Sequence, residues 1–224
     1  MRPWTTIASV STDEGELQLR QRGPREFLIV IAGRVLMTSS ERVSEQALAT
    51  LACAPIADRL APRVLIGGLG MAYTLRAALD ALPATAAVVV AELNPMVVAW
   101  CRGPLAALAD DAVFDPRVRV EIADVAAAIA SAPRASYDAI MIDLYEGPHA
   151  ATQRNNDPFY GTDALRRSHD ALAPGGMFAV WAEEPDAAFA RRFLAAGFET
   201  SSHRLGKTRR HVVYLGRMPY TRAR

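Results

Sequence analysis

The segment from Arg63 to Glu92 constrains the fold of this chain more than any other stretch. Val64–Ile66 is a short apolar run that ends at glycines, which is typical of a buried parallel strand. Tyr73–Leu82 has helical spacing, and a second apolar run, Ala87–Ala91, leads directly to the carboxylate of Glu92. The segment therefore predicts a strand, a glycine loop, a helix, a second strand and an acid in succession.

The glycine loop and the acid together predict a site for a nucleoside. Gly67, Gly68 and Gly70 can adopt backbone angles closed to other residues and let a ligand approach the main chain. The free N–H groups in the first turn of the next helix face the same loop. A carboxylate at the end of the second strand can accept hydrogen bonds from both hydroxyls of a ribose. Leu69 and Met71 interrupt the glycine fingerprint of dinucleotide-binding proteins, which counts against NAD.

The rest of the chain predicts a small β lobe followed by one α/β domain. The lobe is expected to be an antiparallel sheet with strands at Glu16–Arg20, Glu26–Ala32 and Val35–Met37. Ser39 or Ser40 can cap the helix that follows. After Pro62, strands alternate with helices, which predicts a parallel sheet covered on both faces. We expect residues 1–60 to form the lobe with its connecting helix, and residues 61–224 to form a Rossmann-like domain.

Three acidic residues, Glu92, Asp124 and Asp143, end consecutive strands of the expected sheet. Ligands of open α/β sheets bind beyond the carboxyl ends of the strands. An aspartate after a strand is commonly a helix cap, and Asp124 can be only that. Three acids at equivalent strand ends nevertheless predict a shared site. In it, Glu92 would hold a ribose, Asp124 would accept from an adenine amino group, and Asp143 would lie near the reacting end of the ligand.

Composition and charge exclude several other classes of function. A net charge of +1 with scattered basic residues argues against a nucleic-acid partner. The chain has no run of about 18 apolar residues and no signal-peptide layout, so we expect a cytoplasmic protein without a membrane partner. Cys53 and Cys101 have no partners at metal-ligand spacing, so we expect buried thiols and no metal site.

A short basic cluster lies between the last two expected strands. It comprises Arg204, Lys207, Arg209 and Arg210, with His203 and His211 on either side. We interpret the cluster as a solvated hairpin, with contact to an anionic acceptor as the alternative.

The motifs of this chain resemble those of class I S-adenosylmethionine (AdoMet) enzymes. The similar stretches are Val64–Gly70, Ala91–Pro95, Ile122–Asp124 and Tyr137–Asp143. Further stretches resemble the spermidine synthase branch in particular, namely the β lobe, Asp143–Pro148, Phe159–Tyr160 and Ala173–Gly176. The resemblance spans about residues 25–216. It implies a Rossmann-like class I AdoMet-dependent methyltransferase fold, with a seven-stranded sheet whose last strand is antiparallel.

The resemblance also implies a co-substrate and roles for single residues. AdoMet or its decarboxylated form would be bound, without a metal, by Gly67, Gly68, Gly70, Glu92, Leu93, Asp124, Val125 and Asp143. Glu92 matches the ribose-binding acid and Asp124 the adenine-binding acid. Asp143 matches the aspartate that accepts the proton from an attacking amine, and Glu146 falls where a second acid contacts that amine. Members of the family are commonly dimers, so a homodimer is expected.

Aromatic residues supply candidate walls for the acceptor site. They are Tyr145, His149, Phe159, Tyr160 and Trp181, with plain packing as the alternative for each. The acceptor is expected to be a small molecule, and the sequence does not identify it.

Two departures from the polyamine synthases favour methyl transfer. Those enzymes carry an aspartate where this chain has Gly70, and an Asp-Glu-x-x-Tyr-His-Glu signature where it reads Ser40–Gln46. The loop acid helps to admit a donor that has lost its carboxylate, because two close carboxylates repel. With Gly70 in its place, intact AdoMet fits, so we expect methyl transfer to a small molecule, an amine being one option. The alternatives are aminopropyl or aminocarboxypropyl transfer and a catalytically silent, dimeric interaction module.

Overall fold

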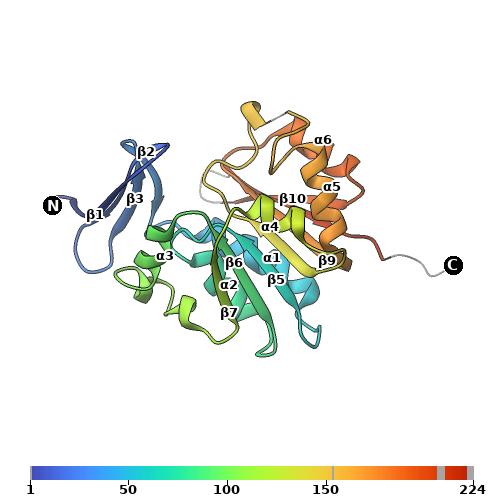
Figure 1. Ribbon diagram of the computed structural model, residues 1–224, viewed down its shortest axis with the longest axis horizontal. Coiled ribbons are helices and arrows are strands. Elements are labelled where there is room, and N and C mark those ends of the chain that lie inside the picture. The colour runs from blue at the N-terminus through green and yellow to red at the C-terminus, as the bar shows by residue number, and fades with distance from the viewer. Residues whose placement is uncertain (1, 153, 206–209, 221–224) are drawn as a thin grey trace.

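The computed structural model describes residues 2–152, 154–205 and 210–220. A small N-terminal sheet stands at one end of the molecule, and a larger sheet with helices on both faces makes up the rest (Figure 1). The C-terminal end of the described chain lies at the opposite end from the small sheet.

The N-terminal lobe is a four-stranded antiparallel sheet in the order β1-β2-β3-β4. Its strands are β1 (Thr5–Thr12), β2 (Gly15–Gln21), β3 (Phe27–Ile31) and β4 (Arg34–Thr38). The predicted antiparallel lobe is confirmed, with β1 as an additional strand. Alternating residues such as Leu17, Leu19, Phe27 and Ile29 are buried and join the core of the larger sheet.

The larger sheet has seven strands in the order β10-β11-β9-β8-β5-β6-β7. The strands are β5 (Arg63–Gly67), β6 (Ala87–Glu92), β7 (Val118–Ile122), β8 (Tyr137–Ile142), β9 (Leu172–Ala182), β10 (Glu199–Leu205) and β11 (His211–Arg217). Strands β5 to β9 pair in parallel, whereas β11 is antiparallel to both β9 and β10. The predicted fold class, including the antiparallel last strand, is confirmed. The strand order reverses between the neighbouring strands β5 and β8. Ligands of such sheets bind at this point.

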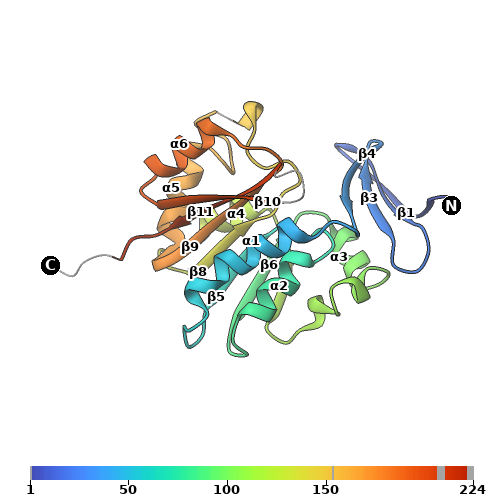
Figure 2. The same cartoon turned by 180° about the vertical axis from the view of Figure 1, so that it is seen from behind.

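Helices cover both faces of this sheet. The α-helices are α1 (Val43–Cys53), α2 (Tyr73–Ala81), α3 (Pro95–Cys101), α4 (Val125–Ser131), α5 (Thr162–Ala171) and α6 (Ala187–Ala195). Single 3-10 turns lie at Ala54–Ile56, Ala106–Leu108, Ala112–Phe114 and Ala150–Thr152. Figure 2 shows α1, α2 and α3 on one face, and Figure 1 shows α4, α5 and α6 on the other. Because β5 is buried on both sides, its residues Val64–Ile66 are all apolar.

Helix α1 packs against α2, β9 and β11, and therefore lies on the larger sheet. The expected serine cap on this helix is wrong. Arg42 occupies the cap position and forms no side-chain cap hydrogen bond. The Ser39 hydroxyl instead accepts from the Phe27 N–H (2.9 Å) and donates to the Arg25 carbonyl (3.1 Å), so it is used inside the β lobe. The boundary near residue 60 stays a prediction.

Two further expectations concern membranes and thiols. Within the described residues, no helix is long and apolar enough to cross a bilayer. Cys53 and Cys101 are free and buried in helices, as expected, and burial raises the pKa of each thiol to about 12.

Candidate active site

Glu92 lies at the carboxyl end of β6, beneath the glycine loop. One carboxylate oxygen accepts from the Leu69 N–H (2.9 Å) and the other from the Asn94 N–H (2.8 Å). Burial raises the pKa of Glu92, and the backbone N–H groups oppose that shift. A carboxylate has about four acceptor positions, and Leu93 contributes a further backbone hydrogen bond, so one position remains for a ligand hydroxyl. The position fits the ribose-binding role predicted for this residue.

The three loop glycines are needed for different reasons. A Cβ on Gly67 would lie 2.6 Å from Val125, so that glycine lets α4 pack closely against the sheet. Gly68 has a φ of +91°, and a Cβ there would collide with the carbonyl oxygen of Asp143. Val125 is buried, so it supports the loop from below.

Gly70 faces the β lobe rather than a charged group. Its φ is +52°, and a Cβ would lie 3.0 Å from the sulfur of Met37 on β4. The Met71 N–H donates to that same sulfur at 3.3 Å. The lobe therefore covers the end of the glycine loop with a thioether.

An apolar surface lies beside Asp124 at the ends of β6 and β7. Asp124 caps α4 by accepting from the Ala126 N–H (2.8 Å), as the capping alternative predicted, and it remains exposed. Leu93 is 72% exposed and Ile122 is 56% exposed. Ile122 pairs with Glu92 across the two strands, so the apolar side chains adjoin the ribose-side acid. A planar base would cover this surface while its amino group reaches Asp124.

Asp143 follows β8 at the centre of the carboxyl edge. Its N–H donates to the Gly67 carbonyl (2.8 Å), and its carboxylate accepts from the Thr74 hydroxyl at 2.5 Å. Burial chiefly, and the negative charge of Glu45 in addition, raise the pKa of Asp143 to about 7, against the lowering effect of Thr74. A carboxylate that titrates near neutral pH is suited to accept and release a proton.

Glu45, on the first turn of α1, was missed by the sequence-based prediction. The Ser44 hydroxyl donates to its carboxylate (2.8 Å) and lies 3.1 Å from the His211 Nδ1. The Thr74 hydroxyl is 3.3 Å from the carbonyl oxygen of Glu45, so α1 and α2 meet beside Asp143. Burial raises the pKa of Glu45. A signal for Glu45 was present in the sequence. Glu45 lies within Ser40–Gln46, the stretch that aligns with the signature of the polyamine synthases.

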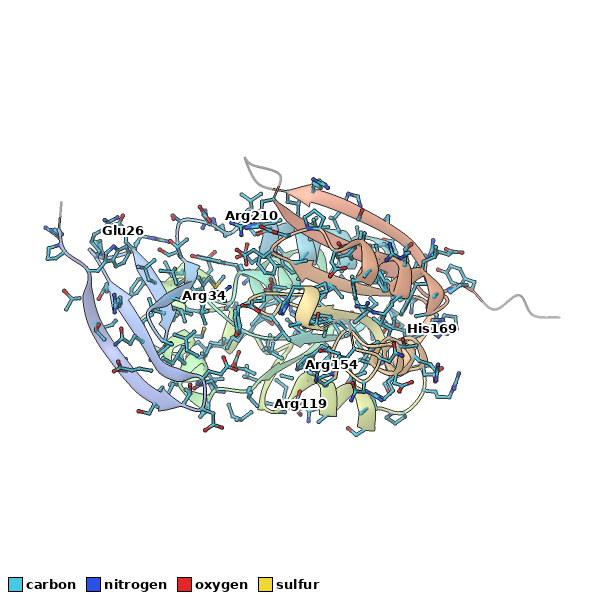
Figure 3. All side chains as sticks on the ribbon, turned by 90° about the horizontal axis from the view of Figure 1, so that it is seen from above. Glu26, Arg34, Arg119, Arg154, His169 and Arg210 are labelled. Carbon is cyan, nitrogen blue, oxygen red and sulfur yellow. The ribbon has the colours of Figure 1, made fainter. Side chains whose placement is uncertain are left out.

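Glu146 is paired with an arginine. Its carboxylate forms an ion pair with Arg34 of β4, and His149 lies 3.4 Å from its other oxygen. Arg34 also lies 3.7 Å from Glu183, at the end of β9. Figure 3 shows Arg34 where the lobe meets the rest of the molecule. The predicted contact of Glu146 with an amine stays a prediction.

The aromatic candidates divide into two groups. Tyr160 is 3% exposed and packs edge-on against Phe189, and its hydroxyl has no partner among the described residues. The buried Nε1 of Trp181 likewise has no partner there. Phe159 is partly buried against the same core as Tyr160. Tyr145 is instead turned toward the lobe, with its hydroxyl 3.4 Å from Glu14 and its ring under Arg34.

The basic cluster is only partly described. Lys207 and Arg209 lie outside the described residues. Arg210, labelled in Figure 3, pairs with Glu183 (2.8 Å) and Glu184 (3.0 Å). His211 contacts Ser44, so this end of β11 reaches the region of Glu45.

Surface hollows lie away from these acids. One of about 740 Å³ is on the β lobe, and one of about 180 Å³ is beside α6. The assignment of the site therefore rests on the side chains and their positions.

Solved structures share this arrangement of sheets and helices. A spermidine synthase in complex with the transition-state analogue AdoDATO matches with a TM-score of 0.74 and 20% identity, covering 95% of this chain and 72% of that one. The spermidine synthase from Thermotoga maritima matches with a TM-score of 0.72 and 19% identity over the same shares. This chain has the spermidine synthase fold. The resemblance found in the motifs is thus confirmed.

Curated relatives match over a shorter segment. The polyamine aminopropyltransferase of Mycobacterium tuberculosis is 32% identical over 124 residues, 54% of this chain and 22% of that protein. The polyamine aminopropyltransferase of Prochlorococcus marinus is 33% identical over 96 residues, 43% of this chain and 32% of that protein. The matches thus span a third or less of these relatives' length. No family model matches the chain.

Proposed function

We propose that this protein transfers an aminopropyl group from decarboxylated AdoMet to a small amine. The observation that carries the proposal is the carboxylate of Asp143 at the centre of the carboxyl edge, with Glu45 beside it and Glu92 at the end of β6, one strand beyond β5. The relatives named above favour aminopropyl transfer over the methyl transfer expected from the sequence.

The donor side of the proposed site is formed by the ends of β5, β6 and β7. Glu92 would accept from a ribose hydroxyl, Asp124 would accept from the adenine amino group, and Leu93 would cover one face of the base. When bound, the donor supplies a sulfonium, whose positive charge activates the adjacent carbon toward attack. The protein then needs only to orient the two reactants and to take one proton.

Asp143 would take that proton. The acceptor nitrogen enters as an ammonium, and one of its protons passes to the Asp143 carboxylate, which frees the lone pair for attack. The nitrogen then forms its new bond to the carbon as the carbon–sulfur bond breaks. The sulfur leaves as a neutral thioether, and the nitrogen becomes a secondary ammonium. A pKa of about 7 leaves a substantial fraction of this carboxyl group ionised at neutral pH.

Methyl transfer from intact AdoMet is the second candidate, and one observation favours it. The glycine loop presents no acid at Gly70, and the group facing that position is the uncharged Met37 sulfur. A donor carboxylate would meet no repulsion from this part of the loop.

Product analysis tests the proposal. The full chain is incubated separately with each donor and 1,4-diaminobutane, and the nucleoside by-product is identified by mass spectrometry. Methylthioadenosine from decarboxylated AdoMet supports aminopropyl transfer. S-adenosylhomocysteine from AdoMet shows methyl transfer instead, and methylthioadenosine from AdoMet shows aminocarboxypropyl transfer. If calorimetry detects no binding of either sulfonium, the proposal fails and the interaction-module alternative is favoured.

We also retain the homodimer as a proposal, because it rests on the resemblance alone. Light scattering coupled to size-exclusion chromatography tests it directly. A mass near 24.2 kDa, that of a single chain, contradicts it.

A further inference from the structure

The two acids predicted to bind the amine, Asp143 and Glu146, have different surroundings. Glu146 is already paired with Arg34, which also lies 3.7 Å from Glu183. The Glu183 N–H donates to the Glu146 carbonyl (3.2 Å), so the backbone holds the two acids together at the rim. An amine that bound Glu146 would have to displace a guanidinium from it.

Asp143 and Glu45 have no arginine or lysine as a counter-charge. Among the described residues, no arginine or lysine forms an ion pair with either carboxylate. The Thr74 hydroxyl joins the two residues, at 2.5 Å from the Asp143 carboxylate and 3.3 Å from the Glu45 carbonyl oxygen. The basic group that acts on Glu45 is the His211 imidazole, which lies across Ser44. Two neighbouring acids without an arginine or lysine form an incomplete arrangement, because like charges repel.

A buried phenol without a partner lies near the same place. The hydroxyl of Tyr160 is buried and unpartnered within the described chain, and Tyr160 is only 3% exposed. Tyr160 belongs to the same apolar core as Ile142, the residue before Asp143. Burial first, and then the charges of Asp157, Asp143 and Glu146, raise the pKa of Tyr160. A phenol oxygen can accept a hydrogen bond from an ammonium group.

We propose that Glu45 and Asp143 together bind the positively charged head of the acceptor, while Glu146 stays paired with Arg34. The acceptor class is an amine that is protonated at neutral pH and presents one cationic end to this pair. The inference deepens the proposed function and rests on it. Glu45 becomes a specificity-determining residue for the acceptor.

The charge of the pair predicts that a proton is released when an amine binds. Without an amine, mutual repulsion favours one shared proton, held on Asp143 below pH 7. A bound ammonium favours two ionised carboxylates, so that proton is released to the buffer. Other titratable groups face the pair, and each is unchanged in the variants below: His211 across Ser44, Tyr73 on α2, Tyr160, and Glu41 before α1.

Calorimetry tests the pair directly. Binding of 1,4-diaminobutane and of n-butylamine is measured at pH 6 in two buffers of different ionisation enthalpy, with S-adenosylhomocysteine or methylthioadenosine present. The wild type is expected to release close to one proton per amine bound. Glu45→Gln should lower the affinity for amine about 10- to 100-fold, because one of two charged hydrogen-bond acceptors is lost. It should also reduce the proton release, because the pKa of Asp143 falls when its like-charged neighbour is removed.

Two further variants are compared. Glu146→Gln distinguishes the two assignments: because Arg34 already pairs with that carboxylate, the proposal expects a smaller loss of amine affinity than from Glu45→Gln. Glu199→Gln removes the same charge from an exposed position at the start of β10 and should change neither the amine affinity nor the proton release. Unchanged nucleoside binding by Glu45→Gln shows that the variant is folded.

The outcomes separate this inference from the proposed function. If Glu146→Gln abolishes amine binding while Glu45→Gln retains both affinity and proton release, the pair is wrong but the transferase proposal stands. If no variant and no wild type binds any adenosyl nucleoside, the proposed function itself fails. A wild type that binds amine without releasing a proton at pH 6 also overturns the pair.

Discussion

The proposed donor side, around Glu92, and the proposed acceptor side, around Asp143 and Glu146, are built in different ways. On the donor side, Glu92 bonds to Leu69 and Asn94, residues of the same strand–loop–helix–strand segment and its immediate continuation. On the acceptor side, Asp143 contacts Thr74, 69 positions away, and Glu146 pairs with Arg34, 112 positions away. The donor side is therefore set by local backbone geometry, and the acceptor side by the packing of distant elements.

This difference has a chemical consequence. Backbone N–H groups and glycine angles define the donor side, so substitutions there are expected to disturb the backbone of the loop. Charged side chains from β4, α1 and the segment after β8 define the acceptor side, where a single substitution alters the charge offered to the acceptor. The comparison predicts large structural effects on the first side and changes of specificity on the second.

The largest expected effect is on chemistry at the acceptor side. Asp143→Asn removes the proton acceptor while keeping the shape of the side chain, so turnover should fall about 100- to 10,000-fold. The measurement is the initial rate of nucleoside release with whichever donor and amine prove active. A rate near that of the wild type would show that Asp143 does not accept the proton.

The next effect is structural and falls on the donor side. Gly68→Ala places a Cβ at a φ of +91° and against the carbonyl of Asp143, so the free energy of unfolding should drop by about 3 to 4 kcal/mol. Gly33→Ala is the matched control, since Gly33 has a φ of +81° but open space around its Cβ, and should lose only about 1 kcal/mol. Urea denaturation measures both. Equal losses would mean that contact with Asp143 does not constrain the loop.

The pH dependence of stability should report on the buried acid. The pKa of Asp143 is raised from 3.8 to about 7 in the folded chain, so folding favours its protonated form. Its stabilising contribution is full below about pH 4 and is lost as the pH rises through about 7, by about 4 kcal/mol. The free energy of unfolding is measured for the wild type and for Asp143→Asn between pH 4 and 8, and the difference between them gives the contribution of Asp143. A difference between the two proteins that does not vary with pH would contradict the raised pKa.

The smallest expected effect is at the rim. Arg34→Gln breaks an exposed ion pair, so the free energy of unfolding should change by less than about 1 kcal/mol. Release of Glu146 should strengthen binding of 1,4-diaminobutane by about two- to fivefold, more than binding of n-butylamine, because only the diamine has a second cation to offer. Arg166→Gln removes another exposed arginine, paired with Asp163, and should affect neither ligand. Equal changes for the two amines would argue against a role for Arg34 in acceptor choice.

The sequence was sufficient for the order of the elements and for the strand-end positions of the three acids. Buried parallel strands are continuous apolar runs, so β5 and β6 could be recognised without tertiary information. Acids that end such strands meet at one edge of the sheet, which is why Glu92, Asp124 and Asp143 could be assigned to a shared site in advance. The Asn94 cap of α3, which accepts from the Met96 N–H at 2.9 Å, was likewise readable from Asn94-Pro95.

The sequence was insufficient where a side chain had several local partners available. Ser39 was expected to cap a helix. In the folded lobe its hydroxyl instead accepts from the Phe27 N–H of β3 and donates to the Arg25 carbonyl. Glu146 was expected to contact an amine. In the structure, β4 of the lobe lies against the segment after β8, and its Arg34 forms an ion pair with Glu146.

The amino-acid sequence by itself determined the sheet, the glycine loop and the line of acids, because periodicity, glycine and strand-end position are local properties of the chain. Only the tertiary structure decided which acids carry a counter-charge and which face each other. That outcome depends on how α1 packs on α2 and how the β lobe lies against the segment after β8. Charge pairing acts through space, so residues far apart in the chain set the electrostatics of the acceptor side.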